Sequence, residues 1–118
     1  MTENEKQLLL KDLCARLPYG FTIHRYSDNR NITFEPNELD EFAHFLEYSE
    51  GEDFKPYLRP MSSMTDEEID RMWEIYESGP AAESSVAVAE YLYERHLDCH
   101  YLIEKGLALE APKDMYKA

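Results

Sequence analysis

The chain contains few of the residues on which specialised local structures depend. Its two cysteines, Cys14 and Cys99, are far apart and lack the CxxC spacing, so they indicate no disulfide framework. Its four glycines leave little room for a glycine-rich loop that binds phosphate. No apolar run approaches the roughly 20 residues that a membrane-spanning helix needs. These absences predict a cytoplasmic protein with reduced thiols and no membrane association.

Basic residues are nearly missing from the middle of the chain. Residues 35–94 contain 17 acidic residues but only Lys55, Arg59 and Arg71 as basic ones, which gives this segment a net charge of −14. The two ends are close to neutral, and the whole chain carries −13. Such a field repels nucleic acid and anionic membranes, so direct binding to either is not expected. A partner that responds to charge would respond to this acidic middle segment.

The apolar content is nevertheless sufficient for a folded protein. Hydrophobic residues make up 43% of the 118 residues and aromatic residues 13%, in contrast to the low hydrophobicity of disordered chains. A domain of this size buries roughly two-thirds of the surface that its unfolded chain exposes. We therefore predict a single globular domain over residues 1–118.

The first predicted element is an N-terminal helix. Thr2 and Glu5 have the spacing of a capping box, in which each side chain accepts a hydrogen bond from a backbone N–H group at the helix start. Pro18 ends the helix because the residue before a proline is disfavoured in the α conformation. The periodicity places four residues on the buried face, and Cys14 is expected to be a small core residue: Leu10, Leu13, Cys14 and Leu17.

Two short β-prone segments and an ambiguous one follow. Residues 21–26 and 32–35 flank a polar turn and predict a β-hairpin. Residues 39–48 fit a helix through Leu39, Phe42 and Leu46, but they also fit a strand with alternating apolar residues. The helix is favoured, and the alternative stays open.

The clearest local signal begins at Met64. Thr65 and Glu68 form a second capping box, and Met64 and Ile69 form a hydrophobic staple, so a helix starts at Thr65. Gly79 and Pro80 end it. Its apolar residues predict an inward face of Ile69, Met72, Trp73 and Tyr76. Its opposite face carries the acidic row Asp66, Asp70, Glu74 and Glu77.

The last third of the sequence predicts one or two further helices. An amphipathic helix carries Val88, Ala89, Leu92 and His96, and Asp98 is placed to cap a short helix that ends at Gly106. The fold class is therefore predicted to be α+β. We expect an N-terminal helix, a small antiparallel sheet, and two or three C-terminal helices packed on that sheet.

Three stretches occur in a recognisable order: KQLLLKDLCARLPYG at 6–20, KPYLRPMSSMT at 55–65 and LIEKGLALEAP at 102–112. With them the chain resembles a family of small uncharacterised proteins, a domain of unknown function, from gut anaerobic bacteria and their phages. The resemblance implies an α+β domain, cytoplasmic expression and a link to mobile elements, but no activity, cofactor or catalytic residue. Near Leu92 the family pattern has tryptophan, and near Cys99 and His100 it has tyrosine and arginine. Chemistry at Cys99 and His100 would therefore not be a family trait.

The metal candidates are His96, Cys99 and His100. On an uninterrupted helix their spacings of three and four would put them on one face, and zinc prefers nitrogen and sulfur ligands. A fourth ligand would have to come from a distant residue such as His24 or His44, and a cap at Asp98 would bend the chain between the candidates. No metal site and no cofactor are predicted, and these three residues are the candidates that the spacing leaves open.

No catalytic motif is found, so a non-enzymatic protein is predicted. Ser62 and Ser63 lack the G-x-S-x-G setting of a nucleophile elbow. The expected function is that of an accessory protein that binds another macromolecule. The aromatic loop is one candidate contact, because aromatic residues, arginine and methionine are enriched in interfaces: Tyr57, Arg59 and Met61. The acidic middle segment is the other.

Two alternatives to a protein-binding module remain open. The acidic row Asp66, Asp70, Glu74 and Glu77 rises about 6 Å per four residues and could imitate a nucleic-acid backbone, which would make the chain an inhibitor of a DNA-binding protein. A small enzyme or metal-binding protein is the other alternative. The identity of the partner and the oligomeric state cannot be read from the sequence.

Overall fold

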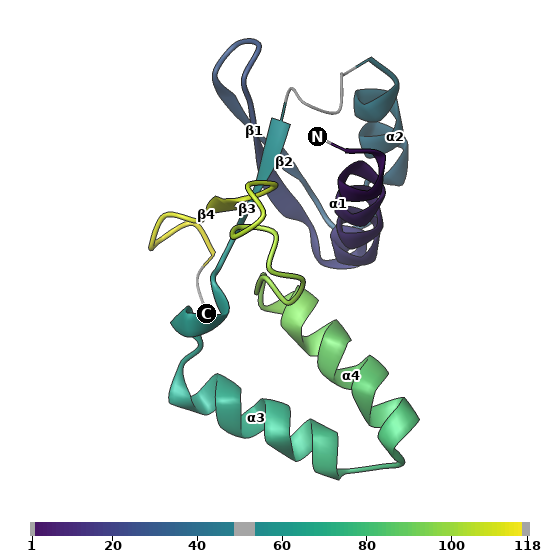
Figure 1. The fold of residues 1–118 in the computed structure, drawn as a ribbon, viewed down its shortest axis with the longest axis vertical. Coiled ribbons are helices and arrows are strands. Elements are labelled where there is room, and N and C mark those ends of the chain that lie inside the picture. The colour runs from purple at the N-terminus through teal and green to yellow at the C-terminus, as the bar shows by residue number, and fades with distance from the viewer. Residues whose placement is uncertain (1, 49–53, 117–118) are drawn as a thin grey trace.

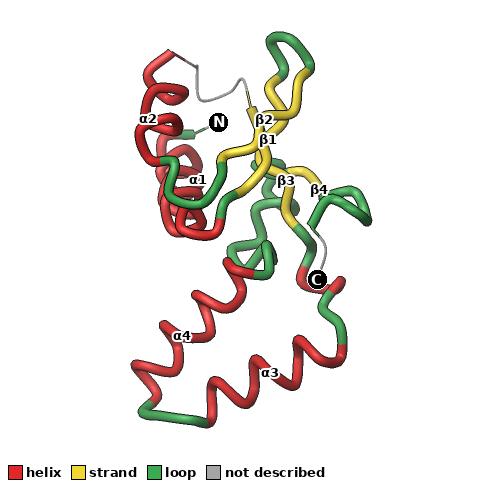
Figure 2. Tube along the Cα trace, turned by 180° about the vertical axis from the view of Figure 1, so that it is seen from behind, coloured by secondary structure: helices red, strands yellow, loops and turns green. Residues whose placement is uncertain are grey.

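The computed structural model describes residues 2–48 and 54–116. Two helices cover one face of a small sheet, and two more helices form a hairpin that extends away from the sheet (Figure 1), as the view from behind also shows (Figure 2). The principal extents of the molecule are 43 × 28 × 26 Å. The elements in chain order are α1 (Glu3–Arg16), η1 (Leu17–Tyr19), β1 (Phe21–Arg25), β2 (Arg30–Phe34), α2 (Leu39–Tyr48), β3 (Phe54–Leu58), η2 (Met61–Ser63), α3 (Asp66–Glu77), α4 (Ala81–Glu94) and β4 (Leu109–Glu110).

The sheet is mixed, with the strand order β2-β1-β3-β4. The predicted hairpin is present, because β1 pairs with β2 in antiparallel register from Phe21↔Phe34 to Arg25↔Arg30. β3 pairs with the other edge of β1, also antiparallel. The prediction of a purely antiparallel sheet is wrong at β4, which runs parallel to β3. The reason is the crossover through α3 and α4, which brings the chain back in the same direction, as parallel pairs require.

The core lies between the sheet and the helices α1 and α2. All five phenylalanines of the chain are buried in it, together with Leu9, Leu13 and Leu17 of α1. The rings pack edge to face, with Phe42 of α2 at 5.3 Å from both Phe21 and Phe34. The segment 39–48 is therefore a helix, as favoured, and it places Phe42 and Phe45 against the sheet.

α1 begins at the predicted capping box, in which Thr2 and Glu5 exchange hydrogen bonds of 2.9 and 3.1 Å. Its buried face differs from the expectation. Cys14 is exposed, so its predicted place in the core is wrong. The buried face instead includes Asp12 and Arg16, which form an ion pair inside the protein. Of the four residues predicted to be buried, Leu13 and Leu17 are buried, Leu10 is half-buried and Cys14 is exposed.

α3 also begins where the sequence predicts, with Thr65 and Glu68 forming a capping box. Its predicted inward face is wrong in part. Trp73 is 52% exposed, Tyr76 46% and Ile69 36%, because the main packing partner of α3 is α4 rather than the sheet. The expectation that the C-terminal helices pack on the sheet is likewise wrong.

The predicted short helix from Asp98 to Gly106 is replaced by a series of turns. Asp98 does act as a cap, since its carboxylate accepts hydrogen bonds from the backbone N–H groups of Leu102 and Ile103 at 2.8 and 2.9 Å. Tyr101 then adopts a φ of 57°, a left-handed conformation that a helix cannot continue through. Among the described residues, no helix combines the length and the apolar character that crossing a membrane would require.

Candidate protein-binding surface

The base of the α3–α4 hairpin is held by an ionic cluster around Glu68. This carboxylate is 3% exposed and accepts hydrogen bonds from Arg59 at 2.7 and 2.8 Å and from Arg95 Nε at 2.8 Å. Hydrogen bonding by Arg59 holds the pKa of Glu68 well below its usual range. Glu68 Oε1 also accepts a hydrogen bond from the backbone N–H of Thr65 at 2.9 Å. One carboxylate therefore connects the end of β3, the start of α3 and the end of α4.

The residues of the predicted aromatic loop serve mainly internal contacts. Arg59 donates further hydrogen bonds to the carbonyl oxygens of Arg95 and Ser63, at 3.2 and 3.0 Å. The Tyr57 hydroxyl donates to Asn31 Oδ1 at 3.2 Å. Met61 is partly buried in η2. Because Arg59 is held on several sides, it is a poor residue with which to contact another protein.

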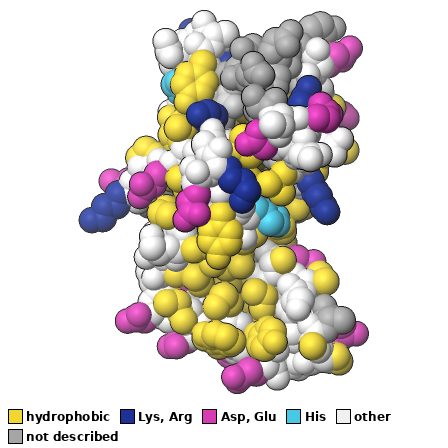
Figure 3. All heavy atoms as spheres, viewed as in Figure 1, with side chains coloured by type: hydrophobic (Ala, Val, Ile, Leu, Met, Phe, Trp, Pro, Cys, Tyr) yellow, Lys and Arg dark blue, Asp and Glu magenta, His cyan; other side chains and the backbone are white. Residues whose placement is uncertain are grey.

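An exposed apolar area lies on the hairpin. Figure 3 shows hydrophobic side chains gathered over α3 and α4, with acidic side chains at the margin of that area. Four large hydrophobic residues of the hairpin are exposed: Ile69, Trp73, Tyr76 and Val86. The Trp73 and Tyr76 rings contact each other edge to face at 5.8 Å. We call the surface formed by Ile69, Trp73 and Tyr76 the aromatic face.

The geometry of α3 explains this exposure. Residues three and four apart lie on one side of a helix, so Glu68, Met72 and Ile75 share the side that faces α4 and are less exposed. The aromatic face lies next to that side rather than on it. The apolar stripe of α3 is thus wider than one neighbouring helix can cover.

The acidic row lies beside the aromatic face. Asp66, Asp70, Glu74 and Glu77 are all exposed. Glu74 forms a surface ion pair with Arg71 at 3.3 Å. Residues 65–95 contain nine acidic residues and two arginines, Arg71 and Arg95, which gives the hairpin a net charge of −7. The hairpin therefore presents an exposed apolar area that is bordered by mainly negative charge.

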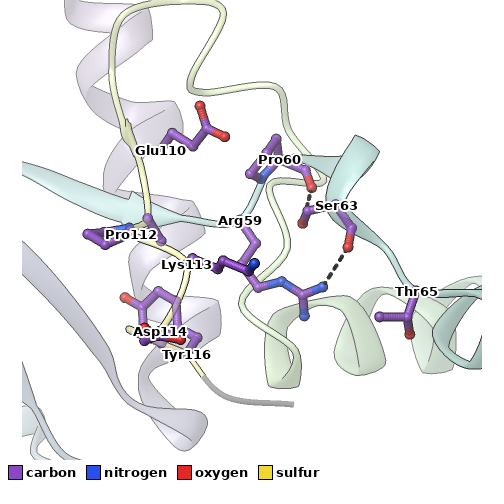
Figure 4. A pocket seen from close by; sticks show the side chains of 10 residues that line it. Arg59, Pro60, Ser63, Thr65, Glu110, Pro112, Lys113, Asp114 and Tyr116 are labelled. Atoms are coloured by element: carbon purple, nitrogen blue, oxygen red, sulfur yellow. Dashed lines mark hydrogen bonds between the residues drawn. The ribbon is translucent and has the colours of Figure 1, made fainter.

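A pocket opens where β3 and the C-terminal segment meet (Figure 4). Its walls carry both signs of charge, from Arg59 and Lys113 and from Glu110 and Asp114. The guanidinium of Arg59 reaches toward Ser63, whose carbonyl oxygen it contacts. Among the residues described as lining this pocket, no nucleophile is paired with a base. The pocket therefore shows no preference for one sign of charge.

The structure separates His96 from the other two metal candidates, Cys99 and His100. α4 ends at Glu94, and His96 adopts a φ of 62°, so the helix that would align His96 with Cys99 is interrupted. The His96 ring stacks on Tyr116 with centroids 3.9 Å apart. Burial, helped by the charge of Arg16, lowers the pKa of His96 to about 4.

Cys99 and His100 lie instead beside Asp12 of α1, a residue that the sequence reasoning missed. A signal was present: Asp12 and Arg16 are spaced like Leu9 and Leu13 and share their helix face. A charged pair of opposite sign at positions i and i+4 on an apolar stripe indicates a buried ionic site.

Comparison of the chain with protein-family models, with curated proteins and with solved structures finds no match. The resemblance to the family of small proteins from gut anaerobes and their phages therefore stays a prediction.

Proposed function

We propose that this protein is a non-catalytic binding module that docks onto another protein through the aromatic face of its α3–α4 hairpin. The observation that carries the proposal is the exposure of Trp73 and Tyr76, 52% and 46%, on a helix that starts at a well-formed capping box. Exposed aromatic residues on a well-defined helix are typical of the centres of protein interfaces. Contiguous apolar area rimmed by polar residues is likewise typical of an interaction site.

The charge of the hairpin selects the kind of partner. The acidic row borders the aromatic face, and the hairpin carries a net charge of −7. The complementary surface is an apolar groove flanked by lysine or arginine residues. A second copy of this chain would bring two such acidic hairpins together, and like charges across an interface oppose binding. The proposed occupant is therefore a basic protein and not a second copy.

The test begins with capture of a partner from a lysate of the native host on the immobilised full-length protein. The captured protein is then identified, purified and titrated directly. We expect Trp73→Ser to weaken binding by roughly thirtyfold or more, the size of an interface hot spot. Leu39→Ser is the matched control, because Leu39 is 59% exposed but lies on α2.

Three outcomes decide between occupants. Loss of binding with Trp73→Ser but not with Leu39→Ser, to a partner with a basic surface, supports the proposal. Equal binding by both variants and the wild type contradicts it. A doubled molecular mass of the wild type in solution that returns to monomer with Trp73→Ser would assign the aromatic face to self-association and contradict the proposed partner.

Mimicry of nucleic acid is a second candidate function, favoured by the exposure of all four residues of the acidic row. In that case the partner is a DNA-binding protein, and the carboxylates rather than Trp73 carry the affinity. The double substitution Asp70→Asn and Glu74→Gln would then weaken binding more than Trp73→Ser. Binding would also fall steeply with salt, because exposed charges are screened. Affinity that is insensitive to salt would exclude this function.

A further inference from the structure

Three side chains with metal-binding atoms converge where α1 meets the turns after α4. They are Asp12, Cys99 and His100, and one ligand atom from each lies within 4.8 Å of the other two. His100 Nδ1 is 2.7 Å from Asp12 Oδ2, and Cys99 Sγ is 3.9 Å from the same nitrogen. Asp12 and His100 are 88 residues apart in the sequence, so the tertiary fold creates the cluster.

The supporting backbone is fixed on both sides of the cluster. Arg16 donates a hydrogen bond to the carbonyl oxygen of Leu97 at 2.7 Å, which ties α1 to the segment just before Cys99. The same segment pairs with Arg59, through backbone hydrogen bonds of 2.8 Å on each side of Leu97. Asp12 itself is 1% exposed. The backbone segments that carry the ligand atoms are thus connected to each other and to the end of β3 by hydrogen bonds.

The donor set suits zinc. Zinc binds thiolate sulfur, imidazole nitrogen and carboxylate oxygen, usually in tetrahedral geometry. With ordinary zinc–ligand bond lengths, tetrahedral geometry requires separations of about 3.3 Å between nitrogen and oxygen and about 3.6 Å between sulfur and nitrogen. The corresponding distances here are 2.7 and 3.9 Å, so these two pairs reach tetrahedral separations after changes of about 0.6 and 0.3 Å.

One side of the cluster is open. The His100 side chain is 37% exposed, which gives a metal ion a route in and leaves room for water as a fourth ligand. On the inner side, the Tyr93 ring lies 6.0 Å from the His100 ring. Three protein ligands with one solvent position is the arrangement of an open zinc site rather than a closed structural one.

Arg16 has two opposing effects on the affinity of this site for a metal ion. Its guanidinium contacts both carboxylate oxygens of Asp12 and thereby orients this ligand from behind, as groups around metal sites commonly do. Its positive charge also opposes a cation. With Cys99 as thiolate, Asp12 and Cys99 together carry two negative charges against one on Arg16. The site remains attractive to a divalent ion but binds more weakly than a site without the arginine.

We propose that Asp12, Cys99 and His100 form a binding site for a single zinc ion. On binding, the Cys99 thiol loses its proton to solvent, and His100 Nδ1 gives up its hydrogen bond with Asp12 to ligate the metal. The imidazole proton then lies on Nε2, toward the solvent side. This proposal does not involve the aromatic face, so neither proposal depends on the other.

The test uses full-length protein without a histidine tag, treated with chelator and then titrated with Co²⁺ as a spectroscopic substitute for zinc. We expect one equivalent to bind with a sulfur-to-cobalt charge-transfer absorption in the near ultraviolet, and added Zn²⁺ to abolish that absorption. Cys99→Ser should remove the absorption, and His100→Gln should weaken binding by about tenfold or more. Cys14→Ser and His24→Gln are matched controls, since they change the same residue types outside the cluster.

Cys99 and His100 are partly exposed, so their substitution should leave the core intact. A loss of metal binding in these variants can therefore be distinguished from a loss of folding. Retention of the absorption by Cys14→Ser and His24→Gln, with its loss in Cys99→Ser, supports the site. No absorption from the wild type at a large excess of Co²⁺ overturns it. An absorption that Cys14→Ser removes and Cys99→Ser keeps would also overturn it. Circular dichroism of each variant confirms that it is folded.

Discussion

The two halves of the molecule use aromatic residues in opposite ways. Between the sheet and the helices α1 and α2, all five phenylalanines are buried and contact one another edge to face. On the α3–α4 hairpin, Trp73 and Tyr76 also contact edge to face, but about half of each side chain is exposed. The same kind of ring contact forms the centre of a core in one half and a surface in the other. The difference is that other elements of the protein cover the phenylalanine rings, whereas no other element covers the exposed side of Trp73 and Tyr76 among the described residues.

The attachment of the halves differs as well. The core half is held by apolar burial, whereas the hairpin is attached at its base through the polar groups of Glu68, Arg59 and Arg95. A second link joins α4 to α1, where the Arg16 guanidinium lies 5.0 Å from the Tyr93 ring centroid. These polar contacts fix the orientation of the hairpin relative to the core half and leave the aromatic face uncovered.

The largest effect is expected from truncation in the core. Phe42→Ala removes a ring that packs against both Phe21 and Phe34, and leaves a cavity among buried side chains. We expect the free energy of unfolding to fall by about 4 kcal/mol. Urea denaturation followed by far-ultraviolet circular dichroism measures this change. A loss below about 1 kcal/mol would show that the five phenylalanines do not form the main core.

Glu68→Gln is expected to have the next largest effect. It removes the negative partner of Arg59 and Arg95, whose side chains are 14% and 26% exposed and would be left without their counterion. We expect a loss of about 3 kcal/mol, since removing one member of a buried ion pair leaves uncompensated charge. Glu67→Gln is the control, because Glu67 is the exposed neighbour in the same helix turn.

The part of the molecule that Glu68→Gln destabilises tests whether the hairpin is attached separately from the core half. Hydrogen exchange should increase across α3 and α4 in Glu68→Gln, while amide groups of β1 and β3 keep their protection, since local openings reflect local contacts. Equal acceleration in the sheet would show that the two halves unfold as one unit and that the polar base is not a separate attachment.

The sequence predicts those features of the fold that depend on residues close together in the chain. The starts of α1 and α3 follow from capping boxes, in which residues three apart exchange hydrogen bonds, and both starts are confirmed. The helix at 39–48 is confirmed too, since a 3.6-residue period can be read within one segment. These features need no knowledge of the rest of the fold.

The errors arise where a second element decides the outcome. Periodicity showed that Ile69, Trp73 and Tyr76 share one side of α3, but not that no sheet would cover it. The apolar periodicity alone places Cys14 in the core, whereas the ion pair of Asp12 and Arg16 is buried on that helix instead. The grouping of Asp12 with Cys99 and His100 depends on a contact across 88 residues, which no local pattern encodes.

An acidic pH should destabilise the junction between the halves through His96. Its pKa is lowered to about 4 by burial, whereas an unfolded histidine titrates near 6.5. As pH falls from 6.5 to 4, the unfolded chain binds a proton that the folded chain does not, so stability present above pH 6.5 is lost. The loss is expected to reach roughly 2 to 3 kcal/mol.

His96→Asn tests this assignment, because asparagine tolerates the left-handed backbone at this position. The variant should lose most of the pH dependence of stability between pH 6.5 and 5.5, a range in which a glutamate with the ordinary pKa of 4.5 is still mostly ionised. An unchanged slope in His96→Asn would remove His96 as the cause.

The smallest effect on stability is expected at the aromatic face, where Trp73→Ser should lower the free energy of unfolding by about 1 to 2 kcal/mol. The residue keeps 52% of its surface in water when folded, so its truncation removes less burial than that of a core ring. Trp73 is the only tryptophan, so wild-type fluorescence should show emission typical of a solvated indole and ready quenching by acrylamide. If Trp73→Ser instead destabilised the protein as much as Phe42→Ala, its ring would belong to a core. The difference between the two halves would then disappear, and with it the basis for a binding surface on the hairpin.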